Sequence, residues 1–122
     1  MGARTREATH GLRHIALKTL DIEATERFYI DVLGLEVAFA HRGMTFLTTP
    51  DGDDLLNFIK TRGAFDPGAG GLDHFGIHVP RGRWKTLRAS LDRAGVAIQG
   101  RRGRSAVYVE DPNGYTVELY CD

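Results

Sequence analysis

The sequence predicts an α+β fold built from two tandem modules, each with the order strand, helix and three further strands. A short alternating run that begins at Leu12 carries His14 at its third position, and a similar run that begins at Leu72 carries His74. The two histidines are 60 residues apart (74 − 14 = 60). Apolar residues at helical spacing follow each run, and three short strand-like stretches follow those. The repeated order indicates an internal duplication.

Each predicted helix has a recognisable start or end. In the first module Asp21 is a suitable N-cap, because its carboxylate can accept hydrogen bonds from the free N–H groups of the first turn. Gly34 suits the left-handed position just beyond the helix end. In the second module Pro80 ends the preceding strand and Gly95 ends the helix. The apolar residues at helical spacing are Ala24, Phe28, Tyr29, Val32 and Leu33 in the first helix, and Trp84, Leu87 and Leu91 in the second.

Three short strands are expected after each helix. The predicted ranges are 35–40, 44–48 and 54–60 in the first module, and 96–99, 105–110 and 115–121 in the second. The turn 111–114 joins the last two, since Pro, Asn and Gly each suit a turn position. Residues 61–71 hold four glycines and Pro67 and are interpreted as a flexible linker. We therefore expect a single domain, residues 1–122, with module one at about 11–60 and module two at about 72–121.

Composition limits the classes of function. The chain has 122 residues, and its 16 basic side chains balance its 16 acidic ones, which argues against a nucleic-acid partner. No apolar run approaches the ~20 residues that cross a bilayer, so no membrane association is expected. The first ten residues are polar and lack an apolar core region, so no secretory signal is expected. The single Cys121 cannot form an intramolecular disulfide, and a cytoplasmic location is expected.

Strand parity groups three residues that could bind a metal. Side chains alternate between the two faces of a strand, and His14, His74 and Glu118 each lie opposite the aliphatic residues of their strands. A single histidine or glutamate on a strand is ordinarily hydrogen-bonded or solvated. Here, however, the histidines occupy equivalent positions of the duplicated units. Two histidines and one carboxylate form a donor set that leaves positions open on a divalent metal for substrate.

Several segments resemble the vicinal oxygen chelate superfamily, which includes glyoxalase I, extradiol dioxygenases, fosfomycin-resistance transferases and bleomycin-resistance proteins. The similar segments are residues 14–17, 28–35, 73–77 and 107–119. The resemblance implies paired βαβββ modules whose mixed sheets curl into a cup with the helices outside. It also implies one divalent metal ion on His14, His74 and Glu118, with Fe(II) or Mn(II) favoured and Zn, Ni or Co as alternatives. Relatives of this size resemble homodimers, and His14 could serve the site of its own chain or that of a partner.

The resemblance leaves the reaction open. The superfamily's fourth ligand position falls on Asn57, where glyoxalase I carries a glutamate, and an amide cannot act as a carboxylate base. Asn57 is expected either to contact substrate or to be hydrogen-bonded inside the cup. Tyr108 matches the tyrosine of the dioxygenase closing motif and is a candidate catalytic and substrate-binding residue. The histidines that dioxygenases carry elsewhere are missing. His78 is therefore the candidate acid–base residue, with an ordinary surface histidine as the alternative.

Two functions follow from these expectations. The first is a metal-dependent enzyme that binds a small substrate through vicinal oxygens, with dioxygenase-like chemistry ahead of lyase, isomerase or transferase chemistry. The second is a non-catalytic small-molecule-binding protein of the bleomycin-resistance type. Retention of all three candidate ligands favours the enzyme. Arg101, Arg102 and Arg104 could hold an anionic substrate, but three arginines between two strands more often form a solvated hairpin.

Overall fold

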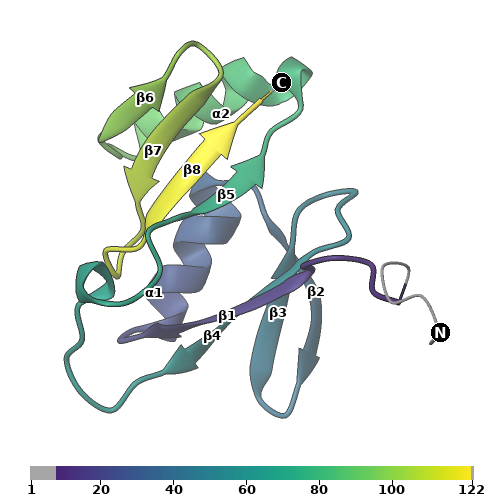
Figure 1. Ribbon diagram of the computed structural model, residues 1–122, viewed down its shortest axis with the longest axis vertical. Helices are drawn as coiled ribbons and strands as arrows, with labels where there is room; N and C mark the ends of the chain where they lie inside the picture. Colours follow the sequence, from purple (N-terminus) through teal and green to yellow (C-terminus); the bar gives the residue numbers. More distant parts are fainter. Residues whose placement is uncertain (1–7, 122) are drawn as a thin grey trace, which may run out of the picture.

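The computed structural model describes residues 8–121, which form two four-stranded mixed sheets and two main helices (Figure 1). The first sheet has the strand order β1-β4-β3-β2. Its strands are β1 (His14–Thr19), β2 (Glu36–His41), β3 (Met44–Thr48) and β4 (Leu55–Lys60). β1 runs parallel to β4, and the other neighbours are antiparallel. The edge strand β2 carries a register shift between Val37 and Phe39.

The second sheet repeats this topology with the order β5-β8-β7-β6. Its strands are β5 (Phe75–His78), β6 (Gly100–Arg102), β7 (Ala106–Glu110) and β8 (Thr116–Tyr120). β5 runs parallel to β8, as β1 does to β4. The predicted α+β fold of two repeated modules is therefore confirmed.

The helices begin and end close to the predicted residues. Asp21 accepts a hydrogen bond from the backbone N–H of Ala24 and caps α1 (Ile22–Arg27), which continues as a π-helical turn, η1 (Phe28–Val32). Gly34 follows with φ +83°, a conformation that favours glycine. In the second module α2 (Trp84–Arg93) follows a 3₁₀ turn, η3 (Arg81–Arg83). A further 3₁₀ turn, η2 (Pro67–Ala69), lies between the modules.

One predicted strand is wrong. Residues 96–99 are not in a sheet, and the strand of this region is β6, beginning at Gly100. The apolar pattern that suggested a strand has another cause, because Val96 and Ile98 are half-buried against the hydrophobic core. The backbone N–H of Gln99 donates to the Tyr108 carbonyl oxygen at 2.8 Å, and the paired register begins at the next residue, with Gly100 aligned with Tyr108.

The aliphatic faces of both sheets contribute to one core. That core includes Leu17 and Leu56 of the first sheet, Val117 and Leu119 of the second, and Leu91 of α2. The opposite faces are left open to solvent over much of their area. These exposed faces carry the candidate site residues of each sheet, and the two sheets occupy opposite ends of the molecule (Figure 1).

A polar network joins the modules near the turn 111–114. The hydroxyl of the fully buried Tyr29 donates to Asp111 Oδ2 at 2.9 Å, and Asn113 Oδ1 accepts from Thr19 Oγ1 at 2.6 Å. Asp111 Oδ1 also accepts from the backbone N–H groups of Asn113 and Tyr115. Burial, and next the nearby Asp111 carboxylate, raise the pKa of Tyr29 well above its ordinary value. Tyr29 therefore stays a neutral donor at this contact.

In the described part of the chain, no helix combines the length and apolar character needed to span a membrane.

Candidate metal centre

His74 and Glu118 come together on the exposed face of the second sheet. His74 directly precedes β5, and Glu118 lies in the parallel neighbour β8, where it is aligned with Gly76. His74 Nε2 is 3.1 Å from Glu118 Oε1. Parallel pairing thus places an imidazole nitrogen and a carboxylate oxygen, the preferred donors of several divalent metals, side by side.

Asp73 supports the imidazole from behind. Its Oδ2 lies 2.7 Å from His74 Nδ1, and an ionised carboxylate can only accept, so Nδ1 carries a proton. This hydrogen bond directs Nε2 towards Glu118. A carboxylate on the remote nitrogen is the usual support of a histidine that binds metal. The hydrogen bond to Asp73, opposed by a smaller desolvation effect, raises the pKa of His74.

Arg102 and Tyr108 complete a ring of four side chains. Arg102 Nη2 donates to Glu118 Oε2 at 2.5 Å, and Glu118 followed by Tyr108 raises the pKa of Arg102. The ring of Tyr108 meets that of His74 edge to face, with centroids 5.5 Å apart. The hydrogen bond from Arg102 lowers the pKa of Glu118 despite an opposing desolvation effect. Each member of the ring comes from a different part of the second sheet: β6, β7, β8 and the residue before β5.

His14 lies apart from this ring, on the exposed face of the first sheet. Its Nε2 is 2.7 Å from Oδ1 of Asn57, a residue of β4 that is only 2% exposed. Because an amide oxygen only accepts, Nε2 of His14 carries the proton in this arrangement. The amide nitrogen of Asn57 contacts Met44 Sδ at 3.7 Å. Of the two expectations for Asn57, this geometry agrees with a hydrogen-bonded residue inside the sheet face.

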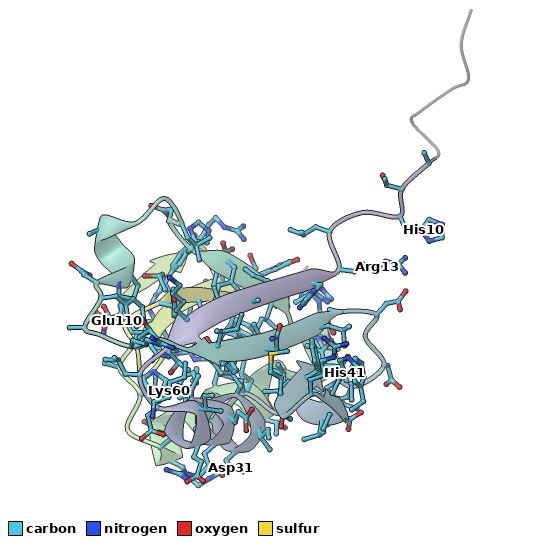
Figure 2. All side chains as sticks on the ribbon, turned by 90° about the horizontal axis from the view of Figure 1, so that it is seen from below. His10, Arg13, Asp31, His41, Lys60 and Glu110 are labelled. Atoms are coloured by element: carbon cyan, nitrogen blue, oxygen red, sulfur yellow. The ribbon has the colours of Figure 1, made fainter. Side chains whose placement is uncertain are left out.

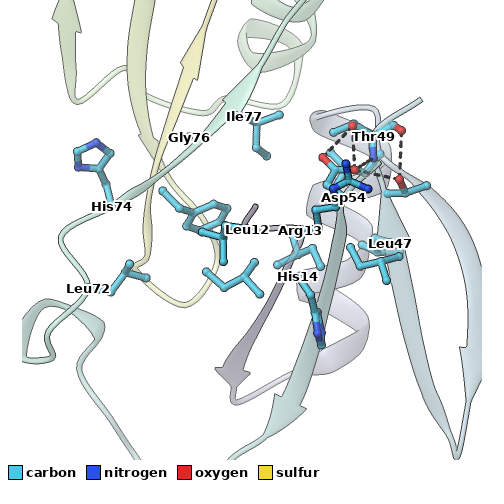
Figure 3. Close-up of a pocket in the computed structure, with 16 residues that line it drawn as sticks. Leu12, Arg13, His14, Leu47, Thr49, Asp54, Leu72, His74, Gly76 and Ile77 are labelled. Atoms are coloured by element: carbon cyan, nitrogen blue, oxygen red, sulfur yellow. Dashed lines mark hydrogen bonds between the residues drawn. The ribbon is translucent and has the colours of Figure 1, made fainter. Parts of the chain in front are cut away.

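The three candidate ligands do not lie close together within a single chain. Among residues 8–121, no three His, Cys, Asp or Glu side chains lie close enough together to hold a metal ion. His14 and His74 both border a mainly apolar pocket of about 380 Å³ between the sheets, but their rings point in different directions (Figure 3). The chain therefore presents two half-sites: His14 with Asn57, and His74 with Glu118.

An aromatic surface adjoins His14. The residues Ala16, Asn57, Phe46 and Phe39 are aligned across all four strands of the first sheet. Phe39 and Phe46 are stacked with centroids 4.7 Å apart, and Phe46 lies 5.7 Å from the His14 ring. Phe39 is 46% exposed, so part of this stacked pair is open to solvent. We call the pair Phe39 and Phe46 the aromatic wall.

The remaining predicted residue, His78, lies on the same strand face as His74. Its ring meets that of Tyr120 at a centroid distance of 5.3 Å. Gly76 lies between the two histidines, and a Cβ there would come within 3.1 Å of the Tyr120 ring. The space over Gly76 is thus filled by Tyr120. The acid–base role of His78 stays a prediction.

Sequence reasoning missed Asp73 and Arg102. Asp73 is adjacent to a candidate ligand, which is the signal that could have identified it. The sequence pattern favours a solvated hairpin at Arg102. When residues 96–99 are taken as the strand, the position of Arg102 in β6 is not evident. Because Gly100 is aligned with Tyr108, strand alternation places Arg102 on the face that carries Glu118.

Residues 11–119 match the Glyoxalase/Bleomycin resistance protein/Dioxygenase superfamily, and the chain belongs to this family. It is 26% identical over 111 residues to the glutathione transferase FosA of Serratia marcescens, covering 89% of this chain and 79% of that protein. It is 29% identical over 123 residues to biphenyl-2,3-diol 1,2-dioxygenase 3 of Rhodococcus globerulus, covering 93% of this chain. That match spans 64% of the dioxygenase, slightly less than two thirds of its length.

A solved structure described as oxidase ChaP-H2 has a similar fold, with a TM-score of 0.73 and 27% identity. The match covers 93% of this chain and 94% of that one. The family includes enzymes, and its members commonly use a divalent metal. In this chain the His74–Glu118 half-site fits such an ion: it offers nitrogen and oxygen donors on one face, with Asp73 in the supporting position.

Proposed function

We propose that this protein is a divalent-metal-dependent enzyme that binds a small substrate through vicinal oxygens. The observation that carries the proposal is the His74–Glu118 pair with Asp73 hydrogen-bonded behind the imidazole. The His74 side chain is 35% exposed and that of Glu118 is 11% exposed, so the imidazole of the pair remains open to solvent. His14 is the proposed third ligand, and Fe(II) or Mn(II) is favoured because the donor set is two nitrogens and one oxygen.

The bound ion would supply Lewis-acid activation of substrate oxygens. The chain's own residues position the site. Asp73 keeps the proton on Nδ1 of His74, and Asn57 holds the ring of His14. Tyr108 lies against His74 with its hydroxyl next to Arg102, where it can hydrogen-bond a substrate oxygen. His78 remains the proposed acid–base residue.

Dioxygenase-like chemistry on a planar aromatic diol is the favoured reaction. The aromatic wall next to His14 supports it, because a stacked pair of phenylalanines offers a flat apolar surface to a ring. The sequence relative named as a dioxygenase and the structural relative named as an oxidase agree with this choice. Transferase chemistry, suggested by the FosA relative, is less favoured, since Arg102 is engaged by Glu118 rather than open to an anion.

Oxygen uptake tests this proposal. Protein loaded anaerobically with Fe(II) is expected to consume O₂ with at least one member of a catechol panel. Phe39→Ala should raise KM more than it lowers kcat, because the wall binds the ring without touching the reacting oxygens. His10→Ala serves as a control, since His10 is an exposed residue on the segment before β1 and belongs to neither half-site (Figure 2). If metal-loaded protein consumes no O₂ with any catechol of the panel, the proposed dioxygenase activity is wrong.

We further propose that the enzyme is a homodimer in which His14 of one protomer completes the site of the other. Each half-site lies on the sheet face opposite the aliphatic core, and within one chain no three candidate side chains meet among residues 8–121. A symmetric dimer would bring the first sheet of each copy against the second sheet of the other. It would then contain two complete sites, each with His14 from one copy and His74 and Glu118 from the other. The aromatic wall would then face a substrate held between the sheets.

Mixing two defective variants tests this assembly. His14→Ala and Glu118→Gln should each bind little metal alone. After denaturation and refolding of an equal mixture, half the dimers are heterodimers, and each contains one intact site. Metal binding should therefore return to roughly a quarter of the wild-type capacity. Sites built within single chains would give no recovery, and this result would refute the shared site.

The alternative function is a small-molecule-binding protein without catalysis. Asn57 has an amide at the position where glyoxalase I carries a carboxylate, and this difference gives modest support to the binding protein. A binding protein should hold its ligand equally well with and without metal, whereas the proposed enzyme should not. A cytoplasmic location, expected from the single cysteine, also stays a prediction.

A further inference from the structure

Arg102 is a cation that directly contacts a proposed ligand, Glu118. Its guanidinium donates to Glu118 Oε2, while Oε1 of the same carboxylate lies beside His74 Nε2. The two carboxylate oxygens therefore have different partners. One is held by an arginine, and the other lies next to the second donor atom.

We propose that Arg102 is a positioning residue that limits Glu118 to one-oxygen coordination. This inference rests on the proposed metal site and goes beyond it, because it assigns a separate role to each carboxylate oxygen. A carboxylate can bind a metal through one oxygen or two, and an oxygen engaged by a guanidinium is a poor second ligand. Oε1 is then the single oxygen offered to the ion.

The surroundings of Arg102 hold it in this role. Its guanidinium donates to Glu118 of β8, and Glu118 is aligned with Tyr108 of the neighbouring strand β7. Arg102 ends β6, which pairs antiparallel with β7. The backbone of Arg102 is held by the pairing of β6 with β7, and its side chain, which is 57% exposed, is held by the contact with Glu118. Arg101 is aligned with Val107, whose side chain is buried in the core, so Arg101 lies on the opposite face.

This arrangement affects the metal in two ways. The positive charge of Arg102 repels a divalent ion bound to Glu118, and the occupied Oε2 leaves one more coordination position for water or substrate. Replacing Arg102 should remove both effects. We expect Arg102→Gln to bind Mn(II) about tenfold more tightly, as expected for loss of a nearby unit charge, and to retain fewer exchangeable waters on the ion.

The experiment uses the full chain with Mn(II). Affinity is measured from the free Mn(II) signal in electron paramagnetic resonance, and coordinated water from proton relaxation. Arg101→Gln is the matched control and should equal wild type in both measurements. Arg102→Lys keeps the charge but lacks the planar fork, so it should stay close to wild type in affinity while losing coordinated water. Weaker or unchanged Mn(II) affinity in Arg102→Gln, with unchanged water, would overturn the proposal.

A metal-free measurement separates this proposal from the proposed function. In the apoprotein, NMR of the arginine side chains should show slow rotation of the Arg102 guanidinium, and faster rotation in Glu118→Gln. Free rotation in wild type overturns the role of Arg102 whether or not metal binds. Restrained rotation in a protein that binds no Mn(II) overturns the metal-dependent function instead, and with it the one-oxygen coordination.

Discussion

His74→Ala and Glu118→Gln should each reduce affinity for Mn(II) or Fe(II) at least about a hundredfold. Each substitution removes a proposed ligand, and the loss of even a supporting contact behind a ligand commonly costs about 10–100-fold in metal affinity. Asp73→Asn should therefore cause a smaller loss, within that range, because an amide can still accept from His74 Nδ1 but carries no charge. Metal content after dialysis and a direct titration give both values.

The same titration should depend on pH. Hydrogen bonding to Asp73 raises the pKa of His74, and a protonated imidazole cannot bind metal. Affinity should increase as pH rises through that raised pKa and level off above it. His10→Ala is the control for nonspecific binding by exposed histidines. Wild-type metal content no higher than that of the His74 and Glu118 variants would contradict the metal site.

Asp111→Ala should destabilise the fold by about 2–4 kcal/mol. Asp111 is 5% exposed and accepts from Tyr29, from the side chain of Asn113 and from two backbone N–H groups. Removing the carboxylate leaves buried donors without partners. Chemical denaturation monitored by circular dichroism gives the change in free energy of unfolding.

Tyr29→Phe provides the graded comparison for Asp111. It removes one donor, and Asp111 keeps its remaining hydrogen bonds, so the expected loss is about 1–2 kcal/mol. The double variant should lose less than the sum of the two single losses, since the residues share a hydrogen bond. Full additivity would show that the contact between Tyr29 and Asp111 does not couple the modules.

Local signals in the sequence predicted most of the fold. The N-cap at Asp21 and the glycine at Gly34 lie where the helix begins and ends. The region 96–99 shows the limit of this approach, because half-buried residues of a connecting segment and residues of a strand have the same alternating pattern. A connecting segment and a strand differ in whether their residues are paired with a neighbouring strand, here at Tyr108. Pairing is a property of the tertiary structure.

The sequence indicated the candidate residues one by one, but not which of them lie together. Strand parity predicted that His14, His74 and Glu118 lie opposite the aliphatic residues of their strands, yet parity does not specify which sheet faces meet. The parallel pairing of β5 with β8 brings His74 to Glu118, while the pairing of β1 with β4 brings His14 to Asn57. Arg102 was missed because its significance depends on the register of β6 with β7.

The network around the turn 111–114 joins the two modules of a single chain, and it lies away from the faces that carry the half-sites. If the half-sites of two chains meet as proposed, separating the protomers would leave this network intact. Each free protomer would remain folded while its metal centre came apart. Catalytic activity per chain would then fall on dilution below the dimer dissociation constant and return on concentration, without any unfolding.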